Sequence, residues 1–167
     1  MRRYTDQTLF TFLDKHQIKH ETHEHEAVFT VDEGKDIKVK LKGGHTKNLF
    51  LKDKSRQYVL VCAIGTTSIQ LNHLHKHIDT KRLSFGKPDA LYALLGVKPG
   101  SVTLFSLIND KEKKVRLILD EALFDHERVW FHPLRNTAST AIYSADIKTF
   151  VKALGRHVTT VDFSKLN

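Results

Sequence analysis

The clearest hydrophobic pattern lies in the first half of the chain, where two apolar runs flank a short polar stretch. Leu49-Phe50-Leu51 and Tyr58–Ile64 are each short enough for a buried strand, and Asp-Lys-Ser-Arg at 53–56 separates them. This pattern predicts a hairpin. A glycine pair at 43–44 predicts a turn just before it. Lys47 and Asn48 would then stand at the mouth of a strand, reachable and held by rigid core.

The rest of the chain alternates between helical and strand periodicity. Helices are predicted from Thr5 to about residue 16, over 31–36 after a Thr30/Glu33 capping box, and over 69–78, 88–95 and 144–154. Strands are predicted at 18–22, 37–42, 81–85, 102–108, 115–119, 129–133, 140–143 and 158–163. The elements show no regular βαβ spacing. We therefore expect an α+β protein with a mixed sheet, curled toward a barrel and flanked by helices.

The strand predicted at 37–42 reads Ile-Lys-Val-Lys-Leu-Lys, a strict alternation. It would put Lys38, Lys40 and Lys42 on one face and three apolar residues on the other. Lysines commonly protect an exposed strand edge, which is one interpretation. A rim that contacts phosphates, beside Lys47, is the other.

Composition adds a charge argument to this picture. The chain has 167 residues, which fits one domain spanning 1–167, and 27 Lys and Arg against 19 Asp and Glu give a net charge of +8. The sequence pI is about 9.6, above the value near 9 at which a nucleic-acid footprint is worth proposing. Basic proteins without nucleic-acid partners also exist, so charge leaves the partner open. The single cysteine, Cys62, lies in an apolar run and predicts core packing in a reducing cytoplasm. No apolar run approaches the roughly 18 residues of a membrane span.

Eleven histidines raise the question of a metal site. His73 and His77 are four residues apart on a predicted helix, but they lie away from its apolar stripe, and no spacing specifies the remaining ligands of a zinc site. No nucleophile elbow, P-loop or Gly-x-Gly-x-x-Gly motif occurs. We expect no metal and no cofactor, and any catalysis would work by positioning and hydrogen bonding.

Two features favour that kind of catalysis. The segment Gly96-Val97-Lys98-Pro99-Gly100 predicts a rigid turn whose N–H groups could donate to an ester oxygen that becomes negative. A plain turn after a helix is the alternative. His132 ends an aromatic strand and is followed by proline. It is a candidate site residue or, alternatively, a hydrogen-bonded core histidine.

Three segments occur in a fixed order: Gly-Gly-His-Thr-Lys-Asn-Leu-Phe-Leu-Lys-Asp at 43–53, Leu-Gly-Val-Lys-Pro-Gly-Ser-Val at 95–102 and Phe-His-Pro-Leu-Arg-Asn at 131–136. The set resembles the YbaK/prolyl-tRNA synthetase-associated editing family, and within it the free-standing prolyl-tRNA editing branch (PrdX or ProXp-ala). The resemblance implies a barrel-like mixed sheet with helices. It also implies a cytoplasmic deacylase that hydrolyses alanine mischarged onto tRNA(Pro).

The resemblance also assigns roles to residues. It makes Lys47 essential to the site, with Asn48 beside it, and it matches the glycine–proline loop and the histidine before proline. Our hypothesis is that Lys47 binds the terminal adenosine, Asn48 the aminoacyl end, N–H groups near Gly100 the ester carbonyl, and His132 the terminal ribose. Candidates for the substrate pocket are Val28, Phe29, Val31, Gly96 and Pro99. Candidates for tRNA contacts are Lys38, Lys40, Lys42 and Lys52.

Two alternatives stay open at this point. The fold could act on another small residue, such as cysteine or serine, carried by the same or another tRNA. The motifs could also only dock the acceptor end of tRNA in a module without catalysis. The expected partner is tRNA(Pro) charged with alanine, the expected state is a monomer, and no membrane contact is expected.

Overall fold

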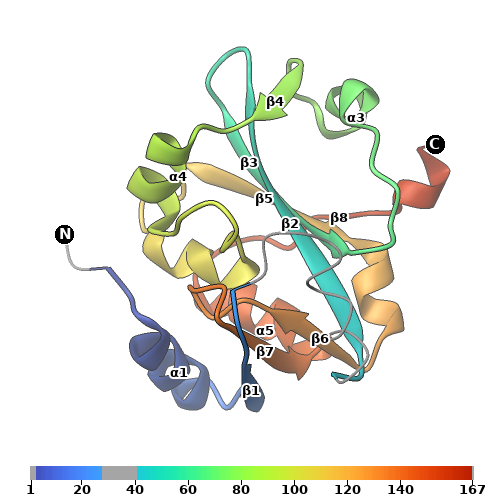
Figure 1. Ribbon diagram of the computed structural model, residues 1–167. Coiled ribbons are helices and arrows are strands. Elements are labelled where there is room, and N and C mark those ends of the chain that lie inside the picture. Colours follow the sequence, from blue (N-terminus) through green and yellow to red (C-terminus); the bar gives the residue numbers. More distant parts are fainter. Residues whose placement is uncertain (1–2, 28–40, 167) are drawn as a thin grey trace.

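The computed structural model describes residues 3–27 and 41–166. Helices and strands alternate irregularly along these residues (Figure 1). The α-helices are α1 (Asp6–Lys15), α3 (Leu71–Ile78), α4 (Pro88–Leu95) and α5 (Ala145–Ala153), and the 3₁₀ helices are η1 (Leu104–Asn109), η2 (Glu121–Asp125) and η3 (Phe163–Lys165). The strands are β1 (His20–Glu24), β2 (Gly44–Asp53), β3 (Tyr58–Ile64), β4 (Leu83–Phe85), β5 (Val115–Asp120), β6 (Arg128–Phe131), β7 (Ala138–Tyr143) and β8 (Thr160–Val161).

Within the described residues, these eight strands form one sheet in the order β1-β7-β6-β2-β3-β5-β8, with β4 paired to β2. The pairs β2/β6, β3/β5 and β5/β8 are parallel and the others antiparallel. The α+β class with a mixed sheet is confirmed.

Strand β2 joins the two halves of the sheet and crosses the molecule diagonally in Figure 1. Its first residues pair with β6, its last residues pair with β4, and β3 runs along most of its length. The predicted hairpin is confirmed, and Asp53 closes it, because its Oδ1 accepts the N–H groups of Ser55 and Gln57 at 2.9 Å each. Side chains on β2 are therefore placed by neighbours on both sides.

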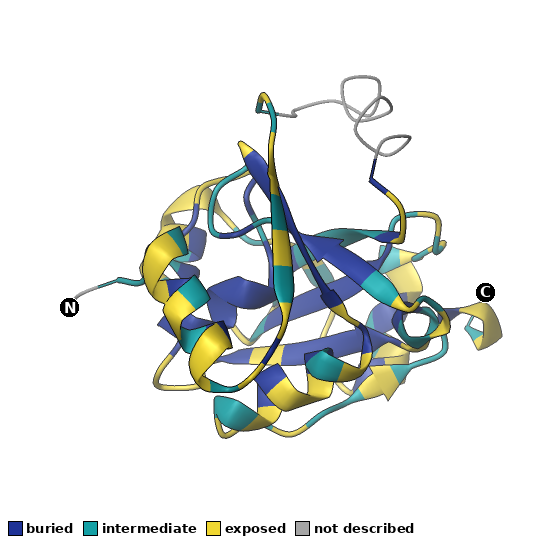
Figure 2. Ribbon diagram, turned by 90° about the horizontal axis from the view of Figure 1, so that it is seen from below, coloured by how far each residue is buried: buried dark blue, intermediate teal, exposed yellow. Residues whose placement is uncertain are grey.

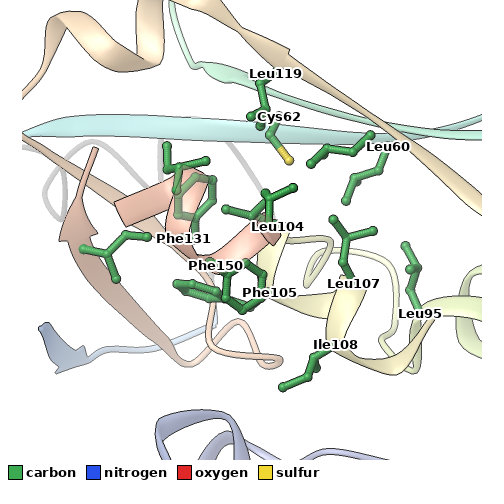
Figure 3. Packing of buried hydrophobic residues seen from close by; sticks show 14 of the residues in the cluster. Leu60, Cys62, Leu95, Leu104, Phe105, Leu107, Ile108, Leu119, Phe131 and Phe150 are labelled. Carbon is green, nitrogen blue, oxygen red and sulfur yellow. The ribbon is translucent and has the colours of Figure 1, made fainter. Parts of the chain in front are cut away.

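The largest core cluster fills the space between the sheet, η1 and α5. Figure 3 shows Leu60 and Cys62 of β3 facing Leu104 and Phe105 of η1, with Phe131 and Phe150 beside them. Cys62 is fully buried, as predicted, and burial raises the pKa of its thiol. A second cluster packs α3 against the other face of β2 and β3.

The elements were predicted well where local signals were strong. Thr5 caps α1 as expected, because its hydroxyl accepts the N–H of Thr8 at 3.4 Å and the Thr8 hydroxyl accepts the N–H of Thr5 at 2.7 Å. Pro88 opens α4, and Gly96 ends it at a φ of 69°.

Two predictions were wrong, and a third was wrong at its last two residues. The strand expected at 102–108 is the 3₁₀ helix η1, which begins where the Thr103 hydroxyl accepts the N–H of Phe105; all six of its residues are buried, so their sequence carries no periodicity. The strand expected at 158–163 is reduced to β8, because the Asp162 carboxylate accepts the N–H of Ser164 and turns the chain into η3. Residues 41 and 42 are not in a strand, and 37–40 and the helix expected at 31–36 lie outside the described residues.

The buried residues lie where the helices pack against the sheet. Figure 2 shows helices with buried inner and exposed outer faces around strands that are largely buried. Among the described helices, none has the length and apolar content needed to cross a bilayer.

Candidate functional site

The first half of β2 and the end of β6 present one common face. His45 and Trp130 are register partners, and their rings stack with centroids 6.3 Å apart. Because side chains alternate along a strand, Lys47 lies on the same face as His45 and its neighbour Trp130. His132 follows directly after β6, which ends at Phe131. Lys47 is the fourth residue of β2, not the residue at its mouth, since pairing begins at Gly44.

Lys47 is held by a chain of contacts that ends at a buried carboxylate. Its Nζ donates to the carbonyl oxygen of Thr67. The Thr67 hydroxyl donates to Oδ2 of Asp120 at 2.5 Å, and the N–H of Ile64 donates to the same oxygen at 3.1 Å. Asp120 is only 1% exposed, and its Oδ1 accepts the N–H of Ala122. Asp120 thus fixes the turn that orients Lys47, whose ammonium keeps two further N–H donors beyond the one used.

Asn48 points to the opposite face, toward Phe50 and the main core. Its Nδ2 donates to the Thr46 hydroxyl at 3.2 Å, and that hydroxyl donates its only proton to the carbonyl oxygen of Trp130 at 2.6 Å. This arrangement fixes the amide orientation, because Thr46 has only acceptor capacity left. Oδ1 of Asn48 is buried and has no partner among the described residues. A buried acceptor left open calls for an explanation.

His132 is half-buried between β6 and β7. Its Nδ1 lies 3.1 Å from the carbonyl oxygen of Ala138, so Nδ1 carries the proton and Nε2 is an acceptor. Burial lowers the pKa of His132, against the hydrogen bond to Ala138, and nearby His25 lowers it further. The His25 ring is centred 6.4 Å from that of His132, and its Nε2 lies 2.8 Å from the Ser139 hydroxyl.

The glycine–proline segment forms the turn that the sequence predicts. The N–H of Ser101 donates to the carbonyl oxygen of Lys98 at 3.0 Å, with Pro99 second and Gly100 third at a φ of 89°, which defines a type II turn. Among the described residues, no hydrogen bond or ring contact joins this turn to Lys47, Asn48 or His132. The N–H of Gly100 has no partner among them either. Its role as a donor to substrate stays a prediction.

The remaining predicted site residues are distributed as follows. Val28, Phe29, Val31, Lys38 and Lys40 lie outside the described residues. Lys42 is exposed, and its carbonyl oxygen accepts the Trp130 indole N–H at 2.8 Å. Lys52 is half-buried in β2 and pairs with Tyr58. None of these placements tests a role in binding.

Four residues around the site were not predicted as members of it: His25, Thr67, Asp120 and Ser139. Thr67 contacts Lys47 and is held by Asp120, and His25 contacts the His132 ring and is held by Ser139. These contacts join distant parts of the chain, so no local spacing signals them. Within the described ranges, no three His, Cys, Asp or Glu side chains gather as metal ligands, and His73 and His77 are both exposed on α3.

Comparison with known proteins gives a consistent result. The profile of the aminoacyl-tRNA editing domain matches residues 25–150. Prolyl-tRNA synthetase associated domain-containing protein 1 of Bos taurus is 38% identical over 153 residues, covering 89% of both chains. Prolyl-tRNA editing protein ProX of Acetoanaerobium sticklandii is 33% identical over 150 residues, covering 89% of this chain and 92% of that one.

A solved structure provisionally described as a trans-editing enzyme for prolyl-tRNA synthetase superposes with a TM-score of 0.69. It covers 97% of this chain and 99% of its own, at 17% identity. At that identity the likeness establishes the fold alone.

Proposed function

Because this chain belongs to the aminoacyl-tRNA editing domain family, we propose that it is a trans-editing deacylase that removes alanine from mischarged tRNA(Pro). The observation that carries the proposal is the match to the editing domain across the segment that contains Lys47, Asn48, Gly100 and His132. The name of the ProX relative supports proline tRNA as the nucleic acid.

The chemistry requires discrimination by size. A pocket for proline rejects a smaller amino acid by only about 1–3 kcal/mol, so a second site must remove the errors. Such a site admits alanine and excludes the proline ring. An aminoacyl ester is already activated, which suits a site without a strong nucleophile.

Oδ1 of Asn48 is a buried acceptor on the face of β2 opposite to Lys47, so we assign Asn48 no contact with the aminoacyl ester. The other side chains have the following proposed tasks. The free donors of Lys47 bind the phosphate or ribose oxygens of the terminal adenosine. Nε2 of His132 accepts a hydrogen bond from the terminal ribose, whose free hydroxyl helps to activate water. The N–H of Gly100 donates to the ester carbonyl as charge develops there.

The deciding experiment compares alanyl and prolyl esters on the same tRNA(Pro). We expect release of alanine at catalytic protein concentrations and survival of the prolyl ester. Equal hydrolysis of both esters would refute exclusion by size. Faster hydrolysis of a cysteinyl or seryl ester would assign a different small residue, and tight binding without ester loss would favour a noncatalytic module.

The residue assignment is tested by Lys47→Ala. Loss of this contact to the terminal adenosine misplaces the ester and lowers kcat/KM by about 100-fold. Lys19→Ala is the matched control, since it removes the same side chain from an exposed position before β1 that has no proposed contact with the substrate. Full deacylation by Lys47→Ala would contradict the assignment.

A further inference from the structure

Several basic side chains line a cavity that the proposed site does not use. A hollow of about 760 Å³ lies between α4, the first residues of β5 and the segment after α5. In Figure 1, α4 lies beside the start of β5. The lining carries six basic side chains and, among the described residues, no Asp or Glu: Arg56, Lys113, Lys114, Arg116, Arg156 and His157.

Most of these charges remain uncompensated. Arg156 pairs with Asp110 at 2.6 Å and Lys114 with Glu112 at 2.9 Å. Lys113 donates to the carbonyl oxygen of Gly155 and Arg116 to that of Ile78, and these backbone contacts orient the cations without neutralising them.

The floor of the cavity is apolar. Tyr58, Leu94, Val115 and Leu117 lie between the basic side chains. Cations around an apolar floor fit a ligand with regularly spaced negative charges and flat apolar groups between them. An RNA strand has this chemistry, because its phosphates meet the cations while its bases and sugars cover the floor.

The cavity lies at the far end of β2 and on the face opposite to Lys47, because Tyr58 stacks on Phe50 and side chains alternate along a strand. Lys47 pairs with Ala63, and Lys52 pairs with Tyr58, which lines the cavity. From Lys47 to Lys52 the strand rises about 17 Å, at about 3.4 Å per residue. A tRNA whose 3′ end meets Lys47 has further backbone phosphates at this range.

We propose that this cavity is a second tRNA contact, which binds the RNA backbone away from the aminoacyl end. The proposal rests on the proposed function for the identity of the RNA. Under this proposal, affinity for whole tRNA depends on the cavity, whereas the rate of ester cleavage does not depend on it.

The test neutralises two cations without backbone strain. Arg56 and Lys113 have positive φ values of 66° and 56°, a conformation that Asn tolerates. We expect Arg56→Asn with Lys113→Asn to weaken binding of uncharged tRNA(Pro) and to lower the slope of log affinity against log salt by about 2. The matched control is Lys19→Asn with Lys165→Asn, which removes equal charge from residues that do not line the cavity.

Three readouts separate the outcomes. Deacylation of a short aminoacyl acceptor-end mimic should be unchanged in the double variant, whereas KM for whole charged tRNA rises. A salt slope equal to that of the control variant overturns the cavity proposal, even if wild-type deacylation is found. Binding that depends on the cavity without any deacylation supports the cavity and refutes the proposed function. Poly-glutamate that displaces tRNA as well as an RNA strand of equal charge would also overturn the assignment to RNA.

Discussion

Strand β5 has a buried aspartate near each end, and the two do different work. Asp110, before the strand, accepts the N–H groups of Lys114 and Val115 and the guanidinium of Arg156. Asp120, at its end, is bonded by backbone N–H groups and the Thr67 hydroxyl, without a cation. The first end borders the basic cavity. The second borders a cavity of about 500 Å³ whose charged lining residues are Asp120, Glu121, Asp125 and Asp162.

This difference separates stability from function along one strand. At the basic end, the aspartate compensates a buried arginine, and exposed cations remain free to contact a partner. At the acidic end, the carboxylate of Asp120 accepts hydrogen bonds from the turn that follows β3 and from the start of η2. The same turn after β3 contacts Lys47 through Thr67. We therefore expect substitutions at the first end to change stability and RNA affinity, and substitutions at the second to change catalysis.

The largest expected effect is that of Asp110→Ala. It leaves the Arg156 guanidinium, which is 7% exposed, buried without its carboxylate, and lowers the free energy of unfolding by about 3–5 kcal/mol. Urea unfolding measures this loss. Deacylation of the acceptor-end mimic per folded molecule should be unchanged. Replacing both partners, Asp110→Ala with Arg156→Met, should recover most of the loss, because no uncompensated charge remains.

We expect Asp120→Asn to lower the free energy of unfolding less than Asp110→Ala does, and to lower the deacylation rate more. An amide at this position presents N–H to a backbone N–H in either orientation, so we expect a loss of about 2 kcal/mol. The turn at Thr67 shifts and Lys47 with it, which lowers kcat by about 10-fold while KM changes little. Thr67→Ser keeps the hydroxyl and the carbonyl and should retain wild-type kcat, whereas Thr67→Val should lose activity. Wild-type kcat in both Asp120→Asn and Thr67→Val would mean that the contact chain does not position Lys47.

The sequence predicted those parts of the structure whose signals lie within a few neighbouring residues. Strand alternation, helix caps and the Pro-Gly turn are local, and they predicted the hairpin, α1, α4 and the turn at Pro99. Residues 104–109 are buried on all sides, so neither strand nor helix period distinguishes them.

The site was less predictable for the same reason. Motifs singled out Lys47 and His132 as candidates, and alternation along β2 explains why Asn48 faces the other way. The bond from Thr67 to Asp120 joins residues 53 positions apart, and no pattern in either segment indicates it. The pairing of His25 with Ser139 likewise exists only once β1 lies beside β7.

The pH dependence of deacylation tests the role of His132, which lies away from both ends of β5. Burial favours the neutral imidazole of His132, so its pKa lies below the ordinary 6.5. Because the pKa of His132 is lower in the folded state than in the unfolded state, neutral His132 favours the folded state above pH 6.5. This contribution to folding stability is lost as pH falls through the lowered pKa. We expect kcat for the mimic to be flat above 6.5 and to fall on acidification only below it. His132→Gln should remove this limb, and an unchanged acid limb would exclude His132 as its source.

The smallest expected effect concerns Lys52, which lies on β2 beside the basic cavity and on the face opposite to Lys47. If RNA backbone follows this strand, Lys52→Gln removes one phosphate contact and lowers the salt slope for tRNA binding by about 1, with kcat for the mimic unchanged. Lys19→Gln is the control, because it removes equal charge beside β1. Additivity with the Arg56→Asn and Lys113→Asn pair would extend the slope loss to about 3 and make the strand and cavity one continuous RNA track. A slope unchanged by Lys52→Gln would instead place the RNA off the strand, and the cavity would have to be reached over another face of the molecule.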